Sequence, residues 1–312
     1  MLPPVGIAAD ETERVASRRA CLATPAALPA PLELDMGSAQ PNRDGSSLAA
    51  DVHAHCALAL EQARLQRQPI RQLTADHPEL QVADAVAIAA AGIALRNGGA
   101  ATHAGWKLGL TSRAKMAQVG VFAPIVGRLC QDMRVDDHGT VQRSAYCHPR
   151  IEPEIAFLLA RDIDPNAGGA EILAAVGMVL PGLEIIDSRY RDFRFTLPDV
   201  IADNTSAAGF VVGGPGESPS GLRARGLELG NLGVIFEVDG VQVDFASTAA
   251  ILDGPAHALV SLVRSLGAEG QRLRAGDLVL AGAPVAAVPL AGVRHVRVMV
   301  EGLGEASVRV ED

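Results

Sequence analysis

Two glutamates stand two positions apart in a short stretch of β-prone residues. Glu152 and Glu154 occur in the run 151–159. Because side chains on a strand alternate between its two faces, both carboxylates lie on one face of the predicted strand. Two negative charges this close repel each other unless a cation lies between them. A pair of this kind is most often a solvated strand face, so the pair alone does not indicate a site.

A third carboxylate changes this interpretation. Glu184 is embedded in the apolar run 178–186, where an ionised side chain is costly unless it is paired or bound to a metal. Three carboxylates on two strands suit a hard divalent cation, either Mg²⁺ or Mn²⁺. No histidine or cysteine accompanies them at zinc spacing, which disfavours zinc. We interpret His148 as a structural hydrogen-bonding residue in preference to one that supports the metal ligands.

Lysine is almost absent from this chain. Of its 27 basic residues, only Lys107 and Lys115 are lysine, and the others are arginine. Lysine gives up its proton far more readily than arginine, so a lysine retained in such a background is a candidate functional residue. The alternative, that both lysines are ordinary surface residues, fits the composition equally well.

The overall composition excludes several classes of protein. The chain has 312 residues, of which 48% are hydrophobic, and this is typical of a globular protein with a sizeable core. Its formal net charge of −9 disfavours general binding to nucleic acids or anionic membranes. Its four cysteines form no CxxC pair, and its N-terminus shows no recognisable secretion signal, so we expect a cytoplasmic protein.

The elements that must position these residues follow an extension. Residues 1–48 are rich in Ala, Pro, Ser and Gly, and we interpret them as a flexible or loosely packed extension before a catalytic domain at 49–312. Two helices are expected first, and short strands and further helices then indicate an α+β fold. The helices are expected at 48–67, 82–95, 170–176 and 255–266, and the strands at 151–159, 178–186, 209–212, 232–238, 241–245, 277–281 and 295–300.

Four segments in this order carry a resemblance to a known family. They are GWKLGLTS at 105–112, HPRIEPEIAF at 148–157, GLEIIDSRY at 182–190 and ADNTS at 202–206. Together they resemble the hydratase and decarboxylase branch of the fumarylacetoacetate hydrolase superfamily, over roughly residues 48–312. The resemblance implies the fold of that family, a mixed β-roll or barrel with flanking helices and an N-terminal helical segment.

The resemblance also implies roles for individual residues. It implies three metal-binding carboxylates, one catalytic lysine and a residue near the substrate, and we add two further substrate-binding candidates from the same motifs. The metal-binding carboxylates are Glu152, Glu154 and Glu184, and the catalytic lysine is Lys107. Ser206 is the residue near the substrate, and Tyr190 and Thr111 are the two further substrate-binding candidates. Phe193 and Phe195 either form, together with Tyr190, an apolar wall that excludes water beside the site, or they belong to the ordinary core. Arg113 and Lys115 either steer a dianionic substrate or are solvated helix residues.

Within this branch the sequence favours decarboxylation. Hydratases of the family carry an aspartate in a segment just after the lysine motif, whereas residues 124–127 here read Pro-Ile-Val-Gly. The resemblance therefore implies Mg²⁺-dependent decarboxylation of 2-oxohex-3-enedioate (4-oxalocrotonate) in the meta-cleavage degradation of aromatic compounds. The alternatives are a 2-hydroxypenta-2,4-dienoate hydratase, an acylpyruvate-type hydrolase, or a non-catalytic structural partner of the hydratase. A homo-oligomer and a complex with the pathway hydratase are also expected.

Overall fold

The computed structural model describes residues 48–112, 116 and 124–312. All of them belong to one structural unit, which spans residues 32–312. Arg113 and Lys115, the candidate steering residues, lie outside the described residues. So does nearly all of the predicted extension, and the domain boundary near residue 48 therefore stays a prediction.

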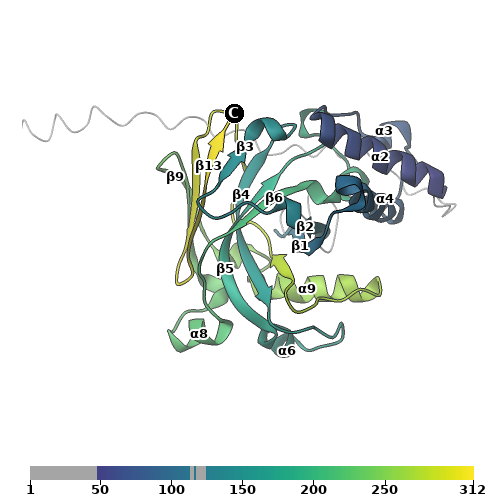
Figure 1. The fold of residues 1–312 in the computed structure, drawn as a ribbon. Helices are drawn as coiled ribbons and strands as arrows, with labels where there is room; N and C mark the ends of the chain where they lie inside the picture. Colours follow the sequence, from purple (N-terminus) through teal and green to yellow (C-terminus); the bar gives the residue numbers. More distant parts are fainter. Residues whose placement is uncertain (1–47, 113–115, 117–123) are drawn as a thin grey trace, which may run out of the picture. The chain divides into compact units, whose positions relative to one another are not determined.

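The two predicted N-terminal helices are present close to their expected bounds. Helix α2 covers Ala50–Gln66, and α4 covers Val82–Leu95, with the short α3 at Leu73–Asp76 between them. Helix α4 begins with a capping box, in which Gln81 and Asp84 satisfy each other's backbone N–H groups. These helices lie together in Figure 1, and with α7 (Leu197–Ala202) they enclose a small apolar core of their own.

Most of the remaining chain forms two sheets (Figure 1). In the first sheet the strand order is β2-β1-β10-β4-β5-β6, with β11 beside β4. Its strands are β1 (His103–Gly109), β2 (Ile125–Cys130), β4 (Arg150–Leu159), β5 (Val176–Ile186), β6 (Ala207–Val212), β10 (Leu278–Leu280) and β11 (Val288–Pro289).

The second sheet has the order β3-β13-β12-β8-β9, with β7 beside β13. Its strands are β3 (Thr140–Gln142), β7 (Gly214–Pro215), β8 (Gly233–Val238), β9 (Val241–Ser247), β12 (His295–Val300) and β13 (Gly304–Glu311). The hairpin between β8 and β9 turns at Asp239 and Gly240, both of which have positive φ. Further helices of the described residues include α6 (Gly169–Ala174), α8 (Pro219–Ala224) and α9 (Pro255–Ala268).

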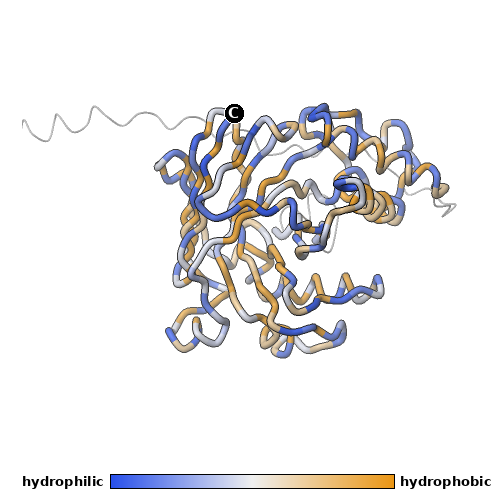
Figure 2. Tube along the Cα trace, viewed as in Figure 1, coloured by the Kyte–Doolittle hydropathy of each residue, from blue (hydrophilic) through white to orange (hydrophobic). Residues whose placement is uncertain are grey.

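One face of the first sheet is apolar and forms the main core. Ile151, Ile155 and Phe157 of β4 are fully buried on it, as the alternation of side chains predicts. The same core contains buried residues of β8, β12, β13 and α9, so this face packs against the second sheet and α9. Figure 2 shows that apolar residues occur along these strands. The opposite face of β4 is therefore the one that carries Glu152 and Glu154.

The first sheet curls until its two edges approach each other. Arg134, just beyond β2, forms a parallel bridge with Phe210 of β6, and the Val135 N–H donates to the Phe210 carbonyl at 2.9 Å. The inner face of the curl is apolar at one end, where Ala156, Leu280 and Phe210 pack together. At the other end it carries Glu152, Glu154 and Glu184. The predicted β-roll with flanking helices is thus confirmed.

Candidate active site

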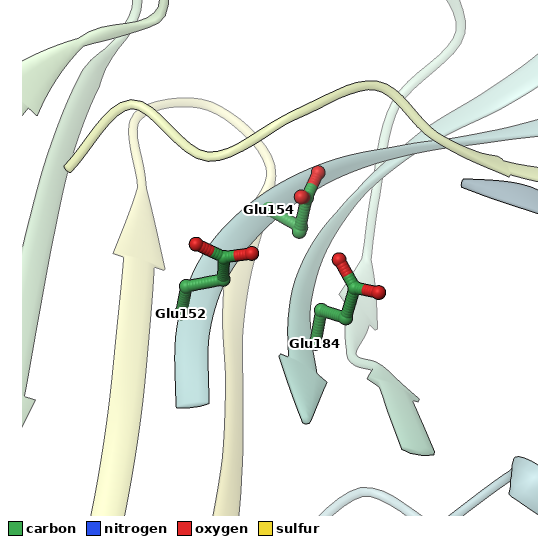
Figure 3. Close-up of side chains that lie close together, drawn as sticks. All are labelled: Glu152, Glu154 and Glu184. Atoms are coloured by element: carbon green, nitrogen blue, oxygen red, sulfur yellow. The ribbon is translucent and has the colours of Figure 1, made fainter. Parts of the chain in front are cut away.

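The three glutamates converge from two neighbouring strands (Figure 3). The register of β4 and β5 places Glu152 directly opposite Glu184, and Glu154 opposite Gly182. One carboxylate oxygen from each glutamate lies within 4.8 Å of the other two. Figure 3 shows the three carboxylates gathered in the same region. The sequence predicted this proximity, and the strand register is its cause.

The environment of these carboxylates fits a divalent cation. Glu154 is 1% exposed and Glu184 is fully buried. One oxygen of Glu154 accepts from the Gly282 N–H at 2.6 Å, but Glu154 Oε1 and Glu184 Oε2 are buried without a hydrogen-bond partner among the described residues. Unpaired buried carboxylate oxygens are costly, and a hard cation is the partner that such oxygens accept. The donor set therefore suits Mg²⁺ or Mn²⁺.

Burial and mutual repulsion also change the acidity of the site. Burial raises the pKa of Glu184 to about 8, because Lys107 offsets only part of the penalty. Burial, together with the charges of Glu184 and Glu152, raises the pKa of Glu154 well above its usual value. A bound cation would oppose both effects and keep the carboxylates ionised.

Lys107 lies inside the same cluster and is not a surface residue. It is 2% exposed, and its Nζ is 3.1 Å from Glu184 Oε1 and donates to the Thr205 carbonyl at 3.1 Å. Burial alone would lower the pKa of Lys107, but the charges of the three glutamates outweigh burial, so its pKa lies above its usual value. The neighbouring carboxylates therefore favour the ammonium form of Lys107.

The curl of the sheet is what brings Lys107 to Glu184. Their strands, β1 and β5, are separated by β10 and β4. The lysine side chain runs over Gly127 of β2, which is opposite it in the register. A Cβ at Gly127 would lie 2.7 Å from the Asn204 carbonyl oxygen and 3.0 Å from Lys107 Cδ. Gly127 thus leaves the space through which the lysine side chain passes.

The segment from Asn204 to Ser206 has an unusual backbone. All three residues have positive φ, of 50°, 53° and 57°, a conformation that costs of order 1–3 kcal/mol for a non-glycine residue. The Asn204 side chain holds the segment by accepting from Arg128 N at 2.8 Å and donating to Arg128 O at 2.9 Å. Thr205 Oγ1 donates to the Val126 carbonyl at 2.8 Å. The result is a carbonyl of Thr205 aimed at Lys107.

Two of the three predicted substrate-binding residues lie close to these groups. The Ser206 hydroxyl is buried and has no hydrogen-bond partner in the described part of the chain. Thr111 is buried against Gly282, where an added Cβ would come 2.1 Å from Thr111 Oγ1. Gly282 has φ +126°, and its N–H donates to Glu154. Thr111 therefore lies against the residue that hydrogen-bonds to a carboxylate of the cluster. The binding roles of Ser206 and Thr111 stay predictions.

The aromatic residues of the predicted wall divide between two roles. Tyr190 is fully buried in the core beneath α2 and α4, and its hydroxyl donates to the Asp199 carbonyl at 3.0 Å. The structure therefore places Tyr190 as a packing residue and does not bring it to the carboxylates. Phe193 lies nearer to them, because its ring contacts Arg150 of β4, with the guanidinium carbon 4.6 Å from the ring centre.

Asp187 is a positioning residue that the sequence reasoning did not single out. Its carboxylate accepts from the backbone N–H groups of Cys147 at 2.9 Å and His148 at 2.8 Å, and its own N–H donates to the Ser206 carbonyl at 2.9 Å. It therefore ties the start of β4 to Ser206. An acidic residue directly after an apolar strand was the available signal. Burial lowers the pKa of His148. Its ring packs on Phe193 with the ring centres 5.2 Å apart, and its buried Nε2 has no hydrogen-bond partner among the described residues, so a hydrogen-bonding role for His148 stays a prediction.

Comparisons with known proteins agree with this fold. The family model described as "Fumarylacetoacetate (FAA) hydrolase C-terminal" matches residues 107–311. This chain belongs to the fumarylacetoacetate hydrolase family. The match begins at Lys107 and includes all three glutamates of the cluster.

Relatives within the family include decarboxylases and hydratases. A 4-oxalocrotonate decarboxylase from a Pseudomonas species is 45% identical over 251 residues, which cover 80% of this chain and 95% of that protein. A 2-keto-4-pentenoate hydratase from Paraburkholderia xenovorans is 37% identical over 235 residues, which cover 74% and 86%. The solved structure of 4-oxalocrotonate decarboxylase from Pseudomonas putida G7, complexed with magnesium and adipate, is 34% identical with a TM-score of 0.79, and the match covers 85% of this chain and 99% of that one. No helix in the described part of this chain is long and apolar enough to cross a membrane.

Binding of Mg²⁺ to the three carboxylates is expected to stabilise the folded protein. At about 100 times its dissociation constant, a ligand specific for the folded state adds about 2.7 kcal/mol to the free energy of unfolding. Glu154→Gln should abolish this increase, yet leave the metal-free protein at least as stable as the wild type. The amide can still accept from Gly282, while one repelling charge is lost. Thermal unfolding with Mg²⁺ or EDTA measures both effects.

The matched control for this experiment is Glu171→Gln, at an exposed position in α6. It should retain the full Mg²⁺ response. An undiminished Mg²⁺ response in Glu154→Gln would contradict the metal site.

Because Gly127 leaves space for the Lys107 side chain, we expect substitution of Gly127 to destabilise the protein. Gly127→Ala is expected to lower the free energy of unfolding by about 1–3 kcal/mol, because the new methyl group overlaps the Asn204 carbonyl and the lysine stem. Gly168→Ala is the control, since its φ is −68° and no atom lies within 4 Å of the added Cβ. Urea unfolding of both variants is the measurement, and equal stabilities would show that no such passage exists.

Proposed function

We propose that this chain catalyses the Mg²⁺-dependent decarboxylation of 2-oxohex-3-enedioate to 2-hydroxypenta-2,4-dienoate and CO₂, in the meta-cleavage degradation of aromatic compounds. The observation that carries the proposal is the cluster of three carboxylates, two of them buried, with the Lys107 ammonium 3.1 Å from one of them. The 45% identity to a decarboxylase supports the choice of reaction.

The reaction needs an electron sink at the 2-oxo group. When the C5–C6 bond breaks, its electron pair forms the C4=C5 double bond, the C3=C4 pair moves to C2–C3, and the carbonyl pair moves to the 2-oxo oxygen. Protonation of that oxygen gives the 2-hydroxydiene. A divalent cation held by the three glutamates would supply Lewis acidity at the 2-oxo acid end of the substrate.

We assign Lys107 to the charge that develops on the 2-oxo oxygen. Its ammonium is already oriented by Glu184 and the Thr205 carbonyl, so it need not reorganise during the reaction. We propose that it acts there as a fixed positive charge and not as a proton donor. Ser206 and Thr111 are proposed to bind the substrate, and the Ser206 hydroxyl, which has no hydrogen-bond partner among the described residues, supports this role.

The local surroundings favour decarboxylation over hydration. Residues 124–127, which follow the lysine motif, contain no carboxylate that could activate a water molecule. Phe193 and the apolar end of the roll limit the water around the cluster, and a poorly solvated carboxylate loses CO₂ more readily. The hydratase relative at 37% identity makes water addition the second candidate.

Partners of the chain follow from the family resemblance alone. We propose a homo-oligomer and an association with the hydratase that consumes 2-hydroxypenta-2,4-dienoate, in the cytoplasm. Co-purification with that hydratase and mass measurement in solution test these two proposals.

The products of the reaction decide among the candidate functions. With 2-oxohex-3-enedioate and Mg²⁺, we expect a change in ultraviolet absorption together with one CO₂ per substrate, and EDTA should abolish both. Water addition without CO₂ would indicate a hydratase, and cleavage into two acids an acylpyruvate-type hydrolase. No turnover of any 2-oxo acid would indicate a structural partner. Activity that is unchanged in EDTA would contradict the metal model.

Removal of the lysine charge should separate catalysis from metal binding. Lys107→Met is expected to lower kcat by about 10²–10³-fold, the usual loss when one preorganised group that stabilises an oxyanion is removed. Affinity for Mg²⁺ should stay equal or increase, because a positive charge beside Glu184 is lost. Steady-state kinetics and calorimetric Mg²⁺ titration measure the two effects. Arg309→Met, at an exposed position of β13, controls for a simple change of net charge, and near-normal turnover of Lys107→Met would exclude the lysine from the mechanism.

A further inference from the structure

A further side chain shares the face of β4 that carries Glu152 and Glu154. Arg150 begins this strand, two residues before Glu152, and the alternation of side chains places it on the inner face with Glu152 and Glu154. Its guanidinium carbon lies 4.6 Å from the ring centre of Phe193. The arginine thus stands at one end of the carboxylate cluster, in contact with an aromatic ring.

Arg150, which is partly buried, differs from the two buried arginines of the described residues in having no acidic partner there. Arg189 is paired with Asp203, and Arg96 is paired with Asp132. Across residues 48–112, 116 and 124–312, Arg150 makes no ion pair and no side-chain hydrogen bond, although it is only partly exposed. Phe193 contacts the guanidinium at its ring face and makes no use of its N–H donors. A guanidinium in this state is suited to a planar anion, above all a carboxylate.

We propose that Arg150 binds the second carboxylate of the substrate, the one remote from the 2-oxo acid end, and thereby selects dicarboxylates. This inference rests on the proposed function. Two strand residues advance about 7 Å along the chain, and the carboxylate carbons of an extended six-carbon diacid are about 6 Å apart at ordinary C–C bond lengths. A diacid with its 2-oxo acid end near Glu152 therefore places its other carboxylate within reach of Arg150.

The chemistry of the reaction predicts how this contact affects KM and kcat. The carboxylate held by Arg150 is the one that leaves as neutral CO₂, so the ion pair weakens as the transition state is approached. An interaction made in the ground state and lost in the transition state lowers KM without raising kcat. Arg150 is therefore a specificity residue, and Arg150→Met should raise KM while kcat stays the same or increases.

The test compares two saturated 2-oxo acids that differ in one carboxylate. 2-Oxoadipate and 2-oxohexanoate share the same 2-oxo acid end, and only 2-oxoadipate offers a carboxylate to Arg150. Calorimetric titration of the Mg²⁺-loaded full chain should show 2-oxoadipate binding more tightly. Arg150→Met should lower the affinity for 2-oxoadipate by at least about tenfold, as expected for a partly buried charge pair, and leave that for 2-oxohexanoate unchanged.

Two further variants make this test specific. Arg150→Lys keeps the charge but loses the planar fork, and it should restore only part of the preference for 2-oxoadipate. Arg194→Met removes one exposed positive charge next to Phe193 and should leave both affinities unchanged. Thermal unfolding of each variant establishes that it is folded.

Each result has one meaning. Equal 2-oxoadipate affinities in the wild type and in Arg150→Met would overturn the inference about Arg150 and leave the decarboxylase proposal standing. An equal loss of affinity for both acids would also overturn it, because the arginine would then act on the 2-oxo acid end or on the site as a whole. If neither acid binds to the wild type with Mg²⁺, the proposed function itself fails.

Discussion

The repulsion among three carboxylates, two of them buried and one partly buried, is the constraint on which the rest of the site depends. Glu154 and Glu184 are removed from water, and both have a raised pKa for that reason. Lys107 offsets part of the negative charge, and the remaining unpaired oxygens need a cation. Removing charges from water is costly even when they are paired. The cluster is therefore expected to contribute little to stability until a cation binds to it.

The curled sheet is what keeps such a cluster together. Lys107 and Glu184 come from strands that are not neighbours, and only a closed inner face brings their side chains within 3.1 Å. Side-chain bonds from Asn204 and Thr205 to the backbone of β2 hold the two edges of the curl close to each other. Because the Thr205 carbonyl also accepts from Lys107 Nζ, the segment that joins the two edges also positions the Lys107 ammonium.

Local pattern was sufficient to predict much of this arrangement. The spacing of Glu152 and Glu154 follows from strand alternation, and the apolar run around Glu184 marked a carboxylate that needed a partner. The proximity of Lys107 follows from the curl, which depends on contacts between residues far apart in the sequence. Only the family motifs indicated it in advance. Tyr190 was placed in a substrate wall because its motif continues from Glu184, but the chain turns after β5 and buries the ring under the helices.

The alternation of side chains along β4 also determines the position of Arg150. The rule that put Glu152 and Glu154 on one face puts Arg150 there too, and its freedom from acidic partners became visible only with the fold. A positive group at the far end of the inner face complements the metal-binding carboxylates, because a 2-oxo diacid carries its chelating group at one end and a bare carboxylate at the other. On this proposal the site has a cation-binding end and an anion-binding end, separated by about two strand residues. This polarity would orient a diacid in one direction, with the bond to be broken next to Phe193 and the electron sink next to Lys107.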